Sequence, residues 1–166
     1  VICIPGACAA ITALVSSGLP SSSFVFEGFL PKKKIDRDKI LIEISKHEKT
    51  TIIYESPHRL KKLLKELYGF CGGDREIIVA RELTKKFEEH IGHKIDEVIE
   101  FFEDKEVIGE ITVVLKGINK KMSIVNEVDL KKDLKELINA GLSLSAASKY
   151  LAKKNGINKS IIYNLI

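Results

Sequence analysis

The sequence has few cysteines, no long apolar run and none of the common nucleotide-binding or hydrolase motifs. Its three cysteines form neither an even set for disulfide bonds nor a CxxC pair, which favours a reducing, cytoplasmic setting. No apolar run approaches the roughly 20 residues of a membrane-spanning helix, so no membrane association is expected. GxGxxG, Walker A, GxSxG and HExxH patterns are absent, which argues against dinucleotide, P-loop, serine-hydrolase and zinc-protease sites.

A metal site is not expected either. His90 and His93 form the one local histidine pair, and nothing nearby supplies a third ligand at typical spacing.

The start of the chain resembles the interior of a protein. It begins with Val1 rather than Met, and residues 1–6 look like a strand that runs into a turn rather than a secretory signal. We therefore expect the sequence to start inside a longer protein.

Charge is unevenly distributed along the 166 residues. Residues 119–166 contain nine lysines and four acids, a net charge of +5, whereas residues 1–118 have a net charge of −1. A basic tail is typical of a polyanion partner such as nucleic acid, although solvated lysine-rich helices are also common.

Residues 51–59, TIIYESPHR, join an apolar strand to an amphipathic helix. Ser56 is expected to cap a helix whose first residue is Pro57. Glu55 stands at the strand end, where ligands bind in α/β sheets. The alternative is a capped helix with solvated charges. The helix should bury four leucines at helical spacing: Leu60, Leu63, Leu64 and Leu67.

Strands and helices alternate along the first 118 residues, which predicts an α/β architecture with a mixed sheet flanked by helices. From Val128 onward the pattern is helical only, with three short helices separated by glycine turns that resemble a helix-turn-helix. A helical appendage that binds protein or nothing is the alternative. The expected strands are 1–4, 24–29, 51–54, 77–80, 88–91 and 110–115, and the expected helices include 7–17, 32–47 and 95–102.

Polar residues lie at or near the ends of three of the expected strands and could converge on one cleft. These are Glu27, Glu55 and the segment Arg81–Lys85. The lysines at 32–34 lie beside one such strand end, where they could contact phosphates or simply be solvated.

Five segments identify a resemblance that covers essentially the whole chain. IPGACAAITALVSSGLP, FEGFLPKK, IIYESPHRL, VARELTK and GEITVVL, in this order, resemble the ribosomal RNA small subunit methyltransferase I family. That family has the tetrapyrrole-methylase-like fold with two α/β lobes. The resemblance implies three parts: residues 1–20 as the last strand and helix of the N-terminal lobe, 21–118 as the C-terminal lobe, and 119–166 as a helix-turn-helix-like tail.

The resemblance also implies a function. The family uses S-adenosylmethionine to methylate a cytidine ribose 2′-hydroxyl of 16S ribosomal RNA at the decoding site, as a homodimer in the cytoplasm. Because most of the donor-binding lobe would precede Val1, the fragment alone is expected to be inactive. The implied donor-binding residues are Pro5, Gly6, Ala7, Cys8, Ala9, Glu55 and Leu83. The candidate bases are Glu27 and Glu55, and the candidate RNA-binding residues are Lys32, Lys33, His58, Arg59, Arg81 and Lys85.

Three alternatives stay open. Glu55 with Arg81, or Glu82 with Arg59, could be ion pairs that only shape the cleft. The chain could bind RNA without chemistry. It could also methylate a tetrapyrrole or corrin precursor on the same fold, although a helical tail of the nucleic-acid type argues against that substrate.

Overall fold

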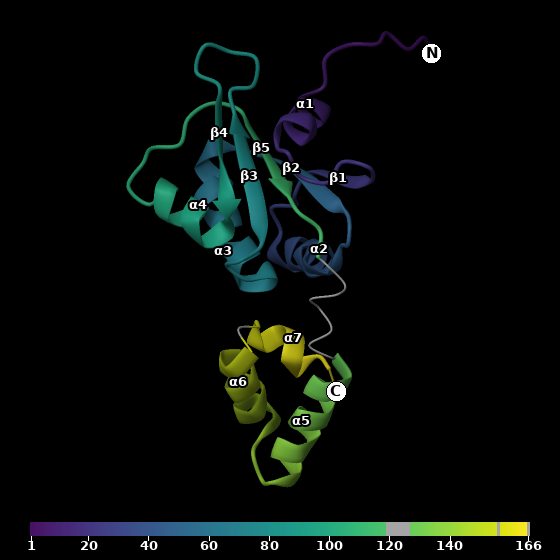
Figure 1. Ribbon diagram of the computed structural model, residues 1–166, viewed down its shortest axis with the longest axis vertical. Coiled ribbons are helices and arrows are strands. Elements are labelled where there is room, and N and C mark those ends of the chain that lie inside the picture. Colours follow the sequence, from purple (N-terminus) through teal and green to yellow (C-terminus); the bar gives the residue numbers. More distant parts are fainter. Residues whose placement is uncertain (119–126, 156, 166) are drawn as a thin grey trace.

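The computed structural model describes residues 1–118, 127–155 and 157–165, and it contains a five-stranded mixed sheet with helices on both faces (Figure 1). The predicted α/β architecture is therefore confirmed. The strands are β1 (Phe24–Phe29), β2 (Thr50–Glu55), β3 (Glu76–Arg81), β4 (Glu89–Lys94) and β5 (Ile111–Leu115). The helices of this part are α1 (Ala9–Ser16), α2 (Lys34–Lys46), α3 (Pro57–Cys71) and α4 (Ile95–Phe102).

The strand order is β1-β2-β5-β3-β4. β1 and β2 are parallel, and β5 runs antiparallel to both β2 and β3. β1, β2 and β3 therefore end at the same edge of the sheet, as expected for the three polar strand ends. Because neighbouring strands lie about 4.8 Å apart, β1 and β3, three positions apart, are separated by about 14 Å.

The two faces of the sheet are covered differently. α2, α3 and α4 cover one face with the larger core cluster, which includes Ile53, Leu64 and Val113. α1 covers part of the other face, where Ala13 packs in one cluster with Ile52. The four leucines predicted on α3 are all buried: Leu60, Leu63, Leu64 and Leu67.

The strand predicted at residues 1–4 is wrong. Residues 1–8 have no secondary structure, and Val1, Ile2 and Ile4 are exposed. A strand needs a hydrogen-bonded neighbour, and none of the five strands pairs with this segment in the part of the chain that the structure describes. The helix that follows is confirmed as Ala9–Ser16. Gly18, two residues past its end, has a φ of 68°, the left-handed conformation that favours glycine.

The start of α3 differs from its prediction in detail. Ser56 is the N-cap residue and Pro57 begins the helix, as predicted, but the Ser56 side chain makes no capping hydrogen bond. Instead, the Ser56 N–H donates to Glu55 Oε1 at 2.8 Å. A neighbouring carboxylate thus takes over part of the capping role.

The three tail helices are present as α5 (Glu127–Asn139), α6 (Leu144–Asn155) and α7 (Lys159–Tyr163) (Figure 1). The Asn158 side chain accepts a hydrogen bond from the Ser160 N–H and caps α7. The helices share their own hydrophobic cluster, formed by Leu134, Ala147, Leu151 and Ile162. The boundary predicted at residue 119 lies outside the described residues, so the division into three parts stays a prediction.

No helix among the described residues is long and apolar enough to cross a membrane. The same residues contain no cluster of three or more His, Cys, Asp or Glu side chains placed to hold a metal ion. Cys3, Cys8 and Cys71 are all free thiols. Burial raises the pKa of the Cys71 thiol to about 11, so this cysteine behaves as a packed apolar residue rather than as a nucleophile.

Candidate functional site

The N-terminal end of α1 lies against the carboxyl end of β2. The Ala10 N–H donates to the Tyr54 hydroxyl at 3.1 Å, which occupies one of the amide groups that a helix start leaves without a partner. Leu83, just after β3, packs in the same cluster as Ala10 and Tyr54. The structure thus gathers the first turn of α1, the end of β2 and the turn after β3 at one edge and on one face of the sheet.

Two phenylalanine rings of β1 pack on the Tyr54 ring because β1 contains a bulge. In a regular strand, residues three apart point to opposite faces. The pairing with β2 shifts between Phe26 and Gly28, and Gly28 has a φ of 63°. Both Phe26 and Phe29 consequently contact the Tyr54 ring, with centroid distances of 5.0 and 5.6 Å. The two phenylalanines remain 50% and 65% exposed, which leaves an apolar surface open to a partner or ligand.

Glu27 is the residue inside this bulge. It has no register partner on β2 and is half-buried. Bulges re-aim side chains and are common beside active sites. Its predicted role as a base stays a prediction.

Glu55 lies in a buried cluster of charges. Its Oε2 accepts a hydrogen bond from Arg37 Nη2 at 3.2 Å, and its Oε1 accepts one from Arg59 Nε at 2.6 Å. Arg37 Nε also donates to Glu66 Oε2 at 2.7 Å. Glu55 and Arg37 are each 2% exposed. The cluster ties the end of β2 to α2 and α3.

This cluster and the α1 site are on opposite faces of the sheet. Successive side chains of a strand alternate between faces, so Tyr54 points toward α1 and Glu55 toward α2 and α3. The geometry favours the ion-pair alternative for Glu55 over base chemistry or donor contact. The partners nevertheless differ from the predicted ones: Glu55 pairs with Arg37 and Arg59 rather than with Arg81.

A shallow depression elsewhere holds none of the predicted residues. It lies between α3 and α4, on the face opposite α1, and is lined by Lys65, Tyr68, Asp96 and Ile99.

The turn after β3 has an unusual backbone. Glu82 and Thr84 have positive φ values of 51° and 65°, a conformation that costs free energy in residues other than glycine. The Glu82 side chain holds the turn, because its Oε1 accepts from the Glu110 N–H at 2.8 Å and from Lys85 Nζ at 3.0 Å. Gly109, with a φ of 89°, packs so closely that an added Cβ would lie 2.6 Å from the Glu82 side chain. Lys85 also pairs with the Glu110 carboxylate at 3.0 Å.

These contacts shift two pKa values in opposite directions. The Glu110 N–H, followed by the Lys85 ammonium, holds the pKa of Glu82 below its ordinary value. Hydrogen bonds to Glu82 and Glu110 raise the pKa of Lys85. Both shifts arise because these contacts stabilise the charged forms of the two side chains.

A pH titration tests this turn. Because the folded pKa of Glu82 is depressed, its contribution to stability is present above the unfolded pKa and fades as the pH falls through the folded value. We expect NMR of the Glu82 carboxyl carbon to give a pKa below the 4.5 of a free glutamate side chain. A pKa of 4.5 or above would contradict the geometry of the turn.

Comparison with known proteins assigns a family to this arrangement. The family model described as Tetrapyrrole (Corrin/Porphyrin) Methylases matches residues 1–99. The chain belongs to the tetrapyrrole methylase family. The solved structure of cobalt precorrin-4 methyltransferase superposes with a TM-score of 0.53 at 14% identity, covering 68% of this chain and 50% of that one, which supports the fold alone.

Two curated relatives of this tetrapyrrole methylase chain carry the same name. Ribosomal RNA small subunit methyltransferase I of Synechocystis sp. is 39% identical over 166 residues, covering 99% of this chain and 60% of the relative. The protein of the same name from Vibrio cholerae is 47% identical over 119 residues, covering 70% of this chain and 41% of the relative. The resemblance seen in the sequence is confirmed. This chain spans only about half the length of such relatives.

Among the residues predicted to contact the donor, only some come together in this tetrapyrrole methylase chain. Ala9 begins α1 and Leu83 lies in the same cluster as α1, whereas Glu55 is on the opposite face. The extended segment before α1 is exposed, and a Cβ at Gly6 would meet nothing within 4 Å. The donor roles of Pro5, Gly6, Ala7 and Cys8 therefore stay predictions.

The residues predicted to bind RNA fall into two groups. Lys32, Lys33 and His58 are exposed. Arg59 is held by Glu55, and Arg81 by Glu89 at 3.0 Å. Lys85 is committed to two carboxylates. The second group is therefore less available to phosphates than the sequence suggests.

Three residues of the site and its support were missed from the sequence. Phe26 and Phe29 looked like ordinary strand residues, and only the glycine inside FVFEGF hinted at a bulge. Arg37 looked like a solvated residue of a charged helix, yet it is buried and one of its nitrogens, Nη1, has no hydrogen-bond partner. No sequence signal marked it.

Proposed function

We propose that this chain is part of an S-adenosylmethionine-dependent methyltransferase that acts on small-subunit ribosomal RNA. The finer proposal is methylation of a cytidine ribose 2′-hydroxyl at the decoding site. The observation that carries it is the gathering of the α1 start, Tyr54 and Leu83 at the carboxyl edge of the sheet, in a chain whose curated relatives are named small subunit methyltransferase I.

The residues at this edge fit a methyl donor with an adenosine moiety. The half-buried Leu83 and Tyr54 side chains offer an apolar wall, and the small exposed side chain of Ala9 leaves room above the helix start. Amide groups at a helix start donate hydrogen bonds to acceptors of a ligand. When bound, the donor supplies an electrophilic methyl group on a sulfonium.

The chain's own task is to hold the two reactants in line. Such positioning can supply about 7–11 kcal/mol of a barrier, so a strong base is not required. The methyl–sulfur bond breaks as the oxygen–methyl bond forms, and the hydroxyl proton must leave. Glu27 is the side chain that we retain as its acceptor, because it is half-buried in the bulge beside the aromatic rings, whereas Glu55 is enclosed by arginines.

The remaining parts of the proposal concern partners and location. Lys32, Lys33 and His58 are exposed near the ends of β1 and β2 and are proposed to contact RNA phosphates. A homodimer is proposed as well, supported by the exposed Phe24 and its neighbours on the edge strand β1. A cytoplasmic location follows from a ribosomal substrate.

The test uses the complete protein of which this chain is part. Small ribosomal subunits are incubated with S-adenosylmethionine labelled in the methyl group, and the RNA is digested to nucleosides. We expect the label in 2′-O-methylcytidine. Label in a methylated base would refute the ribose assignment, and label in a corrin precursor supplied instead of RNA would refute the substrate class.

A further inference from the structure

Among the three tail helices, only the last two have a net positive charge. α5 contains four acids and three lysines, whereas residues 137–166 contain four lysines and no acid. Nothing in α6 or α7 therefore offsets the positive potential of Lys149, Lys153, Lys154 and Lys159. A surface of this kind attracts polyanions.

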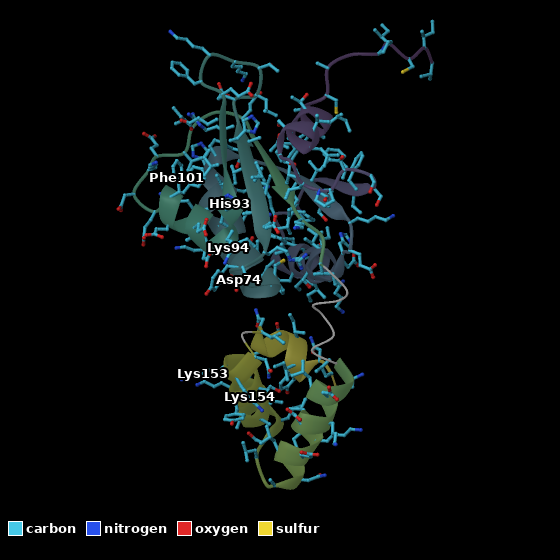
Figure 2. The ribbon with its side chains drawn as sticks, in the orientation of Figure 1. Asp74, His93, Lys94, Phe101, Lys153 and Lys154 are labelled. Atoms are coloured by element: carbon cyan, nitrogen blue, oxygen red, sulfur yellow. The ribbon has the colours of Figure 1, made fainter. Side chains whose placement is uncertain are left out.

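α6 has one buried and one exposed face. Ala147, Ser148 and Leu151 face the tail's core. Lys149 and Lys153 are exposed and four residues apart, so they lie one above the other on the same side of the helix. Lys153 and Lys154 both project from α6 in Figure 2.

Two of the four lysines are committed to contacts inside the tail, and two are not. Lys154 lies 3.8 Å from the Asp133 carboxylate, and Lys159 Nζ donates to Ser145 Oγ at 2.7 Å. In the described part of the tail, neither Lys149 nor Lys153 has an ion pair or side-chain hydrogen bond. Their ammonium groups are free to bind phosphates.

An aromatic ring lies on the same surface. Tyr150 is next to Lys149 and three residues before Lys153, and it is 55% exposed. An exposed ring between free cations is the arrangement on which an unpaired base can stack while its phosphates are held. A duplex would engage the lysines but leave the ring without a stacking partner, because its bases are already stacked.

We propose that the exposed face of α6, formed by Lys149, Tyr150 and Lys153, binds a single-stranded segment of RNA. This inference rests on the proposed ribosomal RNA substrate. The charge complementarity of the acid-free α6–α7 surface supports RNA, and the exposed ring selects unpaired over paired RNA.

The test measures binding of the complete protein, of which this chain is part, to a fluorescent 12-nucleotide single-stranded RNA over a series of salt concentrations. For single strands, each phosphate contact adds about 0.7 to the slope of log affinity against log salt. The variant K149Q/K153Q should therefore lower that slope by about 1.4. The matched control K132Q/K135Q removes two exposed lysines from α5 and should leave the slope unchanged.

Tyr150→Ala isolates the stacking contribution. Stacking on an aromatic side chain contributes about 1–3 kcal/mol, so affinity should fall about five- to 150-fold while the salt slope stays the same. Because Tyr150 is largely exposed, the variant should fold normally, which circular dichroism checks.

Two further probes are measured in the same assay: a duplex of the same RNA, and polyglutamate. Three outcomes would overturn the inference: equal slopes for the two double-lysine variants, an unchanged affinity for Tyr150→Ala, or binding to either further probe that is as tight as binding to the single strand. Failure of this inference can be distinguished from failure of the proposed function. If the complete protein methylates ribosomal subunits while the α6 variants bind RNA normally, this inference fails and the methyltransferase proposal stands. If the α6 variants lose RNA binding but the complete wild-type protein transfers a methyl group to RNA in no assay, this inference stands and the methyltransferase proposal fails.

Discussion

Replacing Glu55 with glutamine should lower the free energy of unfolding by about 3–5 kcal/mol, the usual cost of removing one partner from a buried ion pair. Glutamine keeps the shape of the side chain but not its charge. It would leave the Arg37 guanidinium, already short of one hydrogen-bond partner, without its fully buried anion. Arg37 would retain only the partly exposed Glu66. Urea unfolding at 25 °C measures the difference.

The matched control for this variant is Glu43→Gln. Glu43 is exposed on the same helix as Arg37, so its stability should change by no more than about 0.5 kcal/mol. The double variant R37M/E55Q should be less destabilised than the sum of its single variants, because the two side chains interact directly. A loss below about 1 kcal/mol for Glu55→Gln would show that the cluster does not hold β2 to α2 and α3.

Replacing Ala9 with tryptophan should weaken binding of S-adenosylhomocysteine to the complete protein at least tenfold, about 1.4 kcal/mol or more. Ala9 is the exposed first residue of α1, where the proposed donor lies against the helix start. A bulky ring there occupies the donor's space without disturbing the core. Isothermal titration calorimetry gives the affinity.

The control for the tryptophan variant lies on the same helix. Val15 is 73% exposed and six residues further on, about 9 Å along the axis. Val15→Trp adds a similarly bulky side chain but should leave donor affinity unchanged. If both variants lose the same amount of donor affinity, tryptophan acts through α1 as a whole. If both variants bind the donor as tightly as the wild type, the donor lies elsewhere.

Much of the fold was predictable because local patterns were strong. The helix at 95–102 and the strand at 24–29 have their predicted bounds, and α3 buries the four leucines that its spacing indicated. Residues 1–4 were wrongly predicted to be a strand because their apolar residues have strand propensity, whereas no strand among the described residues pairs with them. Pairing is a property of the whole sheet and is not encoded in that segment.

The site was less predictable because it depends on which face a residue occupies. The strand ends of β1, β2 and β3 do share one edge, as expected. Alternation within β2, however, sends Tyr54 toward α1 and its neighbour Glu55 toward two buried arginines. From the sequence, a carboxylate at a strand end such as Glu55 is readily interpreted as a catalytic group. The sequence does not indicate that Arg37, 18 positions away, is buried against it.

The central claim is that the methyl donor lies on the α1 face of the sheet, and hydrogen exchange tests it most directly. The complete protein is exchanged with and without S-adenosylhomocysteine and digested for mass spectrometry. The account predicts protection at residues 8–12 and 82–85, with little change in α2 and α3. Protection confined to α2, α3 and the depression lined by Lys65, Tyr68, Asp96 and Ile99 would contradict it.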